Sequence, residues 1–313
     1  MLKIRRFVQS GDEGVWVSVW NKAFREFDDF RSISVEDMLK SEKNPAFDAE
    51  GMFFAEFDGK PVGIVNAYVD KMREEKKGFI RMLGVVPEYR RRGIGRALAR
   101  KAIESLKERG MLTVEASGVL GKPEAVNLWE SLGFKSVRIF SLMKRSLENI
   151  PSSIGENKEV TLQTFRKGWM DDLKLLHWLS NEAFKEHYNY RPDSIEETRY
   201  FLEQDPIFKE QQWLFTILQD TPVGYVGAGI DEKYNEEKRT KAGWILSIGV
   251  LKSHRLKGIG TRLMIEGMKL LKAKGMTEAL LGVDDQNPTK AIKLYEKVGF
   301  HAARKDVAYL KTI

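Results

Sequence analysis

Two patterns of apolar residues alternate along this chain, and the same order of patterns occurs twice. Period-two alternation predicts strands, and spacings of three and four residues predict amphipathic helices. In each half, a strand is followed by helices, an apolar strand pair divided by a turn, and another strand that runs into a glycine-rich motif and a long helix. Strands are predicted at 3–7, 52–57, 62–69 and 79–85, and again at 160–165, 213–218, 223–230 and 244–251.

The ends of several helices are also marked in the sequence. Ser34 and Ser194 are each followed three residues later by an acidic residue, which is a capping-box signature. The long helices 94–109 and 259–274 are each followed by a glycine, Gly110 or Gly275. A glycine in this position commonly ends a helix in the left-handed conformation.

The repetition extends to short sequence motifs. Asn21–Glu26 recurs as Asn181–Glu186, and Leu128–Phe134 recurs as Leu294–Phe300, so the offset grows from 160 to 166 residues. A duplicated unit with small insertions in the second copy gives such a rising offset. The main insertion falls in the charged stretch 231–241.

A segment rich in turn formers separates the copies. Residues 149–157 contain Pro, Ser, Gly and Asn without apolar periodicity, which is typical of a linker. We expect an N-terminal domain at 1–148, a linker at 149–158 and a C-terminal domain at 159–313. The mixed order of strands and helices predicts an α/β fold for each domain.

Composition narrows the class of protein. The 313 residues are 42% hydrophobic and contain no cysteine, which excludes disulfides and thiolate chemistry. No apolar run is long enough to cross a bilayer, and the first residues lack the apolar stretch of a secretory signal, so we expect a cytoplasmic protein. The four histidines show no metal-ligand spacing, and no metal is expected.

The charge balance admits two interpretations. The net charge of +7 can reflect a solvated surface rich in Lys and Glu, or it can indicate a polyanionic ligand. A nucleic-acid partner is disfavoured because no basic stripe interleaved with aromatic residues occurs.

The pattern Arg-x-x-Gly-x-Gly follows a strand and opens a helix in both copies, at 90–95 and 255–260. Glycines let the backbone approach an anion, and the first-turn amides point toward it. The alternative is a glycine turn that serves only tight packing between helix and strand. A dinucleotide motif would follow the first strand, and a Walker loop would need Gly-Lys-Ser/Thr, so both are excluded.

At these residues the sequence resembles the GCN5-related N-acetyltransferase (GNAT) superfamily, in both copies and over nearly the whole chain. The resemblance is carried by Ile248-Gly249-Val250, the motif 255–260, Asn287 and the run 291–300. The tandem layout is similar to that of mycothiol synthase. The resemblance implies two tandem GNAT domains, each with a mixed, mostly antiparallel sheet flanked by helices.

The resemblance also implies acetyl-CoA as acyl donor. Its pyrophosphate would lie on the amides of the glycine motif, and its pantetheine arm would pair with the preceding strand. The cofactor-binding residues implied in the second copy are Ile248, Gly249, Val250, Arg255, Leu256, Lys257, Gly258, Ile259, Gly260, Thr261 and Asn287. Those in the first are Leu83, Val85, Arg90, Arg91, Arg92, Gly93, Ile94, Gly95 and Arg96.

The two copies differ at the residue that the resemblance implies as general acid. Tyr295 matches the family tyrosine that protonates the departing thiolate, and Trp129 occupies this position in the first copy. Asn287 is replaced by Gly121. We therefore expect catalysis in the second domain, and in the first a degenerate, non-catalytic domain.

The general base is left open by the sequence. Relatives of mycothiol synthase use a Glu on the fourth strand, but the matching residue here is Trp244, so this role does not transfer. His187 and Asp284 are the preferred candidates, and His187 replaces Phe27 of the first copy. The remaining candidates are Glu182, Glu186 and Asp285.

The expected function is transfer of an acetyl group from acetyl-CoA to a primary amine of a small molecule. One alternative is a protein N-terminal or lysine acetyltransferase, and another is a non-catalytic acyl-CoA sensor. We expect a small amine acceptor, no membrane partner, and a monomer or homodimer. No motif in the sequence identifies the acceptor.

Overall fold

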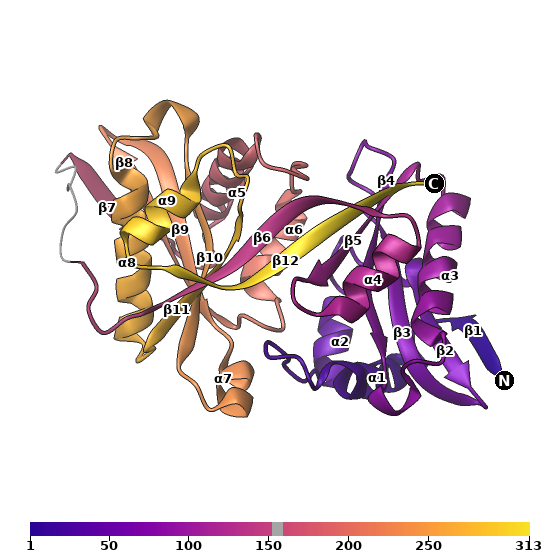
Figure 1. The fold of residues 1–313 in the computed structure, drawn as a ribbon. Coiled ribbons are helices and arrows are strands. Elements are labelled where there is room, and N and C mark those ends of the chain that lie inside the picture. The colour runs from indigo at the N-terminus through magenta and orange to yellow at the C-terminus, as the bar shows by residue number, and fades with distance from the viewer. Residues whose placement is uncertain (152–158) are drawn as a thin grey trace. The chain divides into compact units, whose positions relative to one another are not determined.

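The computed structural model describes residues 1–151 and 159–313, which pack as two compact units (Figure 1). The first unit contains Met1–Ile139 and Asp306–Ile313, and the second contains Phe140–Lys305. Residues 152–158, which make up most of the predicted linker 149–158, lie outside the described residues.

The first unit is built on a sheet with the strand order β1-β2-β3-β4-β5-β12. All of these neighbours are antiparallel except β4 and β5, which run parallel. The strands are β1 (Leu2–Arg6), β2 (Met52–Phe57), β3 (Lys60–Val69), β4 (Lys77–Val85), β5 (Thr113–Val119) and β12 (His301–Thr312). The helices are α1 (Glu13–Phe24), α2 (Val35–Ser41), α3 (Ile94–Glu108) and α4 (Pro123–Ser131).

The second unit repeats this arrangement in the order β7-β8-β9-β10-β11-β6, again with one parallel pair, β10 and β11. The strands are β6 (Lys135–Ser146), β7 (Val160–Thr164), β8 (Glu210–Leu218), β9 (Thr221–Ile230), β10 (Ala242–Val250) and β11 (Glu278–Asp284). The helices are α5 (Met170–Phe184), α6 (Ile195–Glu203), α7 (Glu232–Lys238), α8 (Ile259–Ala273) and α9 (Ala291–Lys297). The charged insertion of the second copy folds as α7. The predicted α/β class with a mixed, mostly antiparallel sheet is confirmed for both units.

Each sheet buries both of its faces, as adjacent residues of β2 illustrate. Phe54 packs edge-on against Trp16 of α1, with ring centroids 5.6 Å apart. Phe53 belongs instead to the core that contains Leu98 of α3. Successive side chains of a strand point to opposite faces, so α1 and α3 cover opposite faces of the sheet. The near-continuous apolar runs of the central strands follow from this double burial.

The predicted helix ends are confirmed. Ser34 and Ser194 each form a full capping box at the start of α2 and α6. Gly110 and Gly275 follow α3 and α8 with φ values of +79° and +82°. Only glycine adopts this left-handed conformation without a steric penalty, so each glycine sets where its helix stops.

The last strand of each sequence repeat pairs in the other compact unit. Residues 140–146 of β6 pair with β11 of the second unit, and residues 306–312 of β12 pair with β5 of the first. The units defined by packing therefore differ from the repeats 1–148 and 159–313 at these strands. A strand edge needs a partner for its amides and carbonyls, and the closing strands of two equivalent repeats can each satisfy either edge.

No helix in the described part of the chain is long and apolar enough to cross a membrane.

Deletion of residues 306–313 tests the exchange of strands. Val307 and Tyr309 are only 4% and 3% exposed, and this segment pairs with all of β5. We expect the amides of β5 to lose protection in hydrogen–deuterium exchange measured by mass spectrometry. The paired amides of β6 and β11 should keep theirs. A loss confined to the second unit would contradict the observed pairing.

Candidate active site

The site is built on an opening between the two parallel strands of the second unit. β10 pairs with β11 only from Ala242 to Trp244 and then continues beside β9 as far as Val250. A register shift between Ile245 and Ser247 bends β10 where the two parallel strands part. Among the described residues, no strand pairs with the β11-facing side of β10 beyond Trp244.

At this opening, backbone amides and carbonyls of β10 that face β11 are available to bind an extended ligand. The predicted cofactor residues Ile248, Gly249 and Val250 all lie on the stretch of β10 that pairs with β9 but not with β11. An exposed strand edge can take up an extended ligand by main-chain hydrogen bonds, as in β-augmentation. The first unit has the same opening, because β4 pairs with β5 only through Ile80 and then continues to Val85. Leu83 and Val85 lie on that stretch.

The loop after β10 has the backbone geometry of an anion site. Leu256 and Gly258 have φ values of +61° and +78°, and α8 begins at Ile259. A non-glycine residue in this conformation costs about 1–3 kcal/mol, and alternation of backbone hand turns successive amides to one concave side. No side chain caps the N-terminus of α8, so its first amides remain available to a ligand.

The first unit repeats this loop closely. Arg91 and Gly93 have φ values of +63° and +79°, and no side chain caps α3. The first helical residues Ile94 and Ile259 are each only 1% exposed, which fixes both helix starts against the cores. The loop therefore has the same backbone conformation and the same uncapped helix start in both units.

The first arginine of each motif is engaged within its own unit. Arg255 donates to the carbonyls of Val250 and Ala183 at 3.1 and 2.9 Å and to the carboxylate of Glu186 at 2.9 Å. Arg90 makes the equivalent three contacts in the first unit, to Val85, Ala23 and Glu26. These guanidiniums fasten the loop to the preceding strand and to the end of α5 or α1. Glu186 also accepts from Lys252 at 2.6 Å.

The other basic residues of the motifs lie nearer to solvent. Lys257 and Arg91 are exposed. Arg92 lies 5.4 Å from the rings of both Phe57 and Tyr89, and Arg96 donates to Ser131 at 2.9 Å. Among the remaining predicted residues, Thr261 is 8% exposed at the start of α8.

The motif glycines that open the helices lie close to the strand. A Cβ on Gly260 would lie 3.0 Å from the side chain of Leu294 and 3.9 Å from that of Val250. A Cβ on Gly95 would have its nearest neighbours, Val85 and Leu83, at 3.8 and 3.9 Å. Close packing against Leu294 is thus one reason for a glycine at position 260, whether or not a ligand also requires it.

Tyr295 lies on α9 and is 8% exposed. Its ring packs 6.3 Å from Phe300, and no hydrogen bond joins its hydroxyl to a described residue. Burial, with a smaller contribution from Tyr225, raises the pKa of this phenol above its ordinary value of about 10. The group is a protonated acid at neutral pH.

Trp129, in the same position on α4, is committed to a structural contact. Its indole N–H donates to the backbone carbonyl of Ser117 on β5 at 2.9 Å. The side chain is 3% exposed and packs against Phe134 with ring centroids 5.2 Å apart. In the first unit, the side chain at this position is therefore hydrogen-bonded to β5.

His187 follows α5 and packs on Phe184, with ring centroids 4.3 Å apart. Burial, and next the positive charge of Arg255, lower the pKa of His187 below 6.5, while Asp284 and Glu186 oppose this shift. The imidazole is therefore neutral at pH 7 and can accept a proton.

The polar residues after β11 form a turn. The carboxylate of Asp284 accepts from the amide of Gln286 at 2.9 Å, and that of Asp285 accepts from Lys305 at 3.2 Å. Asn287 accepts from the amide and the hydroxyl of Thr289 at 2.8 and 2.7 Å. Asp284 is the member of this turn that interacts electrostatically with His187.

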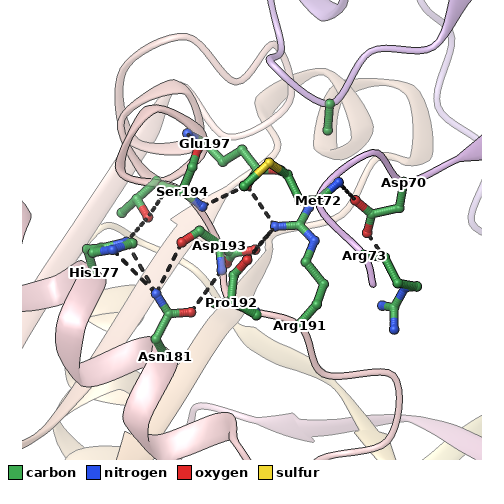
Figure 2. A network of polar contacts seen from close by, with 12 residues as sticks. Asp70, Met72, Arg73, His177, Asn181, Arg191, Pro192, Asp193, Ser194 and Glu197 are labelled. Atoms are coloured by element: carbon green, nitrogen blue, oxygen red, sulfur yellow. Dashed lines mark hydrogen bonds and ion pairs between the residues drawn. The ribbon is translucent and has the colours of Figure 1, made fainter. Parts of the chain in front are cut away.

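Polar side chains hold the segment after α5 in place (Figure 2), and one of their contacts also occurs in the first unit. Asn181 donates to the carbonyl of Asp193 at 3.2 Å and accepts from its amide at 2.9 Å, and Arg191 pairs with Glu197 at 2.5 and 2.7 Å. Asn21 makes the same pair of bonds to Ile33 in the first unit. The shared Asn-x-Ala-Phe motif thus has a structural role. Glu182, another base candidate, pairs with Lys185 at 2.6 Å.

Beside these repeated contacts, the two units differ strongly in side-chain polarity. In the first, Trp20 packs against Phe24 with ring centroids 4.5 Å apart, and the rings of Phe24 and Phe27 lie 5.8 Å apart. Ser180, Phe184 and His187 occupy the equivalent positions in the second.

Three residues of the second unit were missed by sequence reasoning, namely Ser180, Tyr225 and Ser247. Their hydroxyls are hydrogen-bonded to one another beside Gly249. An alignment of the two copies could have revealed these three hydroxyl residues. The equivalent residues of the first copy, Trp20, Ile64 and Met82, are all apolar or aromatic.

No three His, Asp or Glu side chains in residues 1–151 and 159–313 are placed to hold a metal ion.

The fold consists of two α/β units of the same type, each with a mixed sheet that opens beside a glycine loop. The model of the acetyltransferase (GNAT) family matches residues 16–134 and 173–300, one segment in each repeat. The chain belongs to this family and is an N-acetyltransferase. Members of the family use acetyl-CoA as acyl donor.

Curated proteins and a solved structure are similar to this chain. A mycothiol acetyltransferase of Salinispora arenicola is 30% identical over 235 residues, covering 74% of this chain and 72% of that protein. One from Thermobispora bispora is 34% identical over 136 residues, but the match spans only 42% of this chain and 46% of the relative. A tandem GNAT protein of the clavulanic acid biosynthesis pathway has a TM-score of 0.77 at 16% identity, covering 100% of this chain and 98% of that one. The last similarity concerns the fold alone.

Gly258→Glu tests the anion cradle. The new carboxylate would lie among amides that turn toward an anion, and its charge would repel a pyrophosphate. We expect the affinity for acetyl-CoA in the second unit to fall by at least about 10²-fold in calorimetry. Gly93→Glu is the matched control in the first unit and should leave turnover within a few-fold. Unchanged binding by the Gly258 variant would contradict the assignment.

Proposed function

We propose that this protein transfers an acetyl group from acetyl-CoA to the primary amine of a small molecule, and that the second unit carries the chemistry. The observation that carries the proposal is the buried, protonated phenol of Tyr295 in the unit that also has the open strand and the uncapped α8. In the first unit, Trp129 donates its only side-chain proton to β5. An indole so engaged has no proton for a leaving group.

The donor supplies the acetyl group as a thioester. The amine nitrogen forms a bond to the carbonyl carbon, the bond from that carbon to sulfur breaks, and the thiolate leaves. The Tyr295 hydroxyl gives its proton to this sulfur, and solvent restores the phenol. A raised phenol pKa keeps this proton in place at neutral pH, and a positioned acid contributes roughly 10²–10⁴-fold to rate.

The proton of the attacking amine goes to His187 in this proposal. The imidazole is neutral because burial and Arg255 lower its pKa. The negative charge of Asp284 acts on the imidazole and stabilises the imidazolium that forms. Phe27 in the first unit cannot take this role, which agrees with the presence of Trp129 there in place of the proposed acid Tyr295.

The remaining parts position the donor. The amides around Leu256 and the start of α8 would hold its pyrophosphate, and the unpaired stretch of β10 would pair with its pantetheine arm. The first unit would hold acetyl-CoA through the equivalent loop without reaction. The cytoplasmic location and the state as monomer or homodimer stay predictions from the sequence.

A screen for CoA release tests the function. Acetyl-CoA is incubated with the protein and with simple amines, amino sugars, aminothiols and short peptides. We expect release above background with at least one small amine and little release with peptides. Release only with peptides would favour a protein acceptor, and none with any amine would contradict the proposal.

Tyr295→Phe should lower kcat roughly 10²–10⁴-fold with little change in acetyl-CoA affinity, because the ring remains while the acid is lost. The matched change in the first unit, Trp129→Phe, should leave kcat within a few-fold. Equal losses in both variants would show that the first unit also performs chemistry. Since the phenol pKa is raised, the parent enzyme should show no loss of activity from Tyr295 below about pH 10.

His187→Gln tests the base through the pH dependence of kcat/KM. In the parent, activity should be full while the imidazole is neutral and fall as pH drops through a midpoint below 6.5, because the pKa is lowered. The variant should lose this acidic limb and more than about tenfold of the rate. An unaltered profile and rate would exclude His187.

A further inference from the structure

A chain of three hydroxyl groups crosses the interior of the second unit beside the proposed reaction site. Tyr225 on β9 is fully buried, and its hydroxyl donates to Ser180 of α5 at 3.2 Å. The same phenol oxygen lies 2.9 Å from the hydroxyl oxygen of Ser247 on β10. Ser180, Tyr225 and Ser247 are called the hydroxyl chain below.

The number of protons in the hydroxyl chain fixes the polarity at its end. Tyr225 has a single hydroxyl proton and donates it to Ser180, so the bond to Ser247 must be donated by Ser247. Burial raises the pKa of Tyr225 to about 12, so the phenol stays protonated. Ser247 therefore donates its only hydroxyl proton to Tyr225. Its oxygen can then only accept further hydrogen bonds. Unlike Tyr225, Ser247 is partly exposed.

The hydroxyl chain ends on the open stretch of β10, at Ser247. Ser247 comes directly after the register shift in β10 and beyond Trp244, the last residue paired with β11. Tyr225 lies opposite Gly249, and a Cβ on Gly249 would lie 2.6 Å from the phenol ring. The same Cβ would meet Ala183 of α5 at 2.9 Å. The hydroxyl chain thus occupies the α5 face of the sheet, on which His187 follows α5.

Only the unit with Tyr295 has this feature. The counterparts of Ser180, Tyr225 and Ser247 in the first unit are Trp20, Ile64 and Met82, and Ile64 is completely buried in an apolar core. The same fold is therefore built there without any hydroxyl at these positions. A buried polar network is sensitive to every missing partner, so its presence needs a reason other than the scaffold.

We propose that Ser247 contacts the acceptor substrate, its oxygen accepting a hydrogen bond from an N–H of the attacking amine. Tyr225 and Ser180 are positioning residues that hold the proton of Ser247 away from the substrate. A bond to N–H leaves the nitrogen lone pair free to attack the thioester. The inference rests on the proposed function and defines the substrate class as amines that keep an N–H to donate during attack.

The experiment compares acceptor KM with acetyl-CoA affinity in variants of the full chain. D-glucosamine and S-methylcysteine serve as acceptor probes, and CoA is detected chromatographically. Ser247→Ala should raise acceptor KM about tenfold, the typical loss of one hydrogen bond in a binding site, with the acetyl-CoA Kd from calorimetry unchanged. Ser247→Thr retains the hydroxyl and should restore most of the acceptor affinity.

Tyr225→Phe should change acceptor KM in the same direction. The double variant with Ser247→Ala should be no worse than Ser247→Ala alone, because both changes act through one contact. Tyr309→Phe removes a buried phenol hydroxyl from the first unit and is the matched control, expected to leave acceptor KM unchanged.

Two results would overturn the inference alone. They are an unchanged acceptor KM in Ser247→Ala, and a parallel loss of acetyl-CoA affinity, which would indicate a structural role. If the parent protein releases no CoA with either probe or with any other amine, the proposed function fails, and the inference fails with it.

Discussion

The parting of two parallel strands at the centre of each sheet is the constraint on which the site depends. β10 pairs with β11 only from Ala242 to Trp244. Beyond Trp244, the side of β10 that faces β11 has no strand partner among the described residues. Backbone amides and carbonyls require partners, and a strand that loses its neighbour offers a row of them. The register shift at Ile245 and Ser247 turns β10 at this point. The glycine loop follows directly after this stretch of β10, and Ser247 of the hydroxyl chain lies on it.

Duplication preserved the scaffold while the chemistry of the two units diverged. Both retain the left-handed loop residues, the uncapped long helix and the arginine that fastens the loop. They differ where a side chain would meet a substrate, at Trp129 and Tyr295 or at Phe27 and His187. Since the scaffold contacts are made largely by the backbone, such side-chain exchanges leave the fold intact.

Arg255 links the scaffold to the proposed chemistry. Its bonds to Val250 and Ala183 join the end of β10 to the end of α5, which fixes the loop from which α8 begins. Its charge also lowers the pKa of His187, and Glu186 partly offsets this by its own charge. One guanidinium thus both shapes the glycine loop and adds to the effect of burial, which is the main cause of the lowered pKa of His187.

The sequence by itself determined the duplication, the α/β class, the capped helix ends and the glycine motif, because these depend on local periodicity and on residues with special backbone freedom. It also marked Tyr295 and Trp129 as the point where the copies diverge. Tertiary structure alone decided that β6 and β12 pair in the opposite units, since two equivalent closing strands satisfy either edge equally well. It alone gave Arg90 and Arg255 their internal partners and joined Ser180, Tyr225 and Ser247, because these contacts link residues up to 72 positions apart that no local pattern relates.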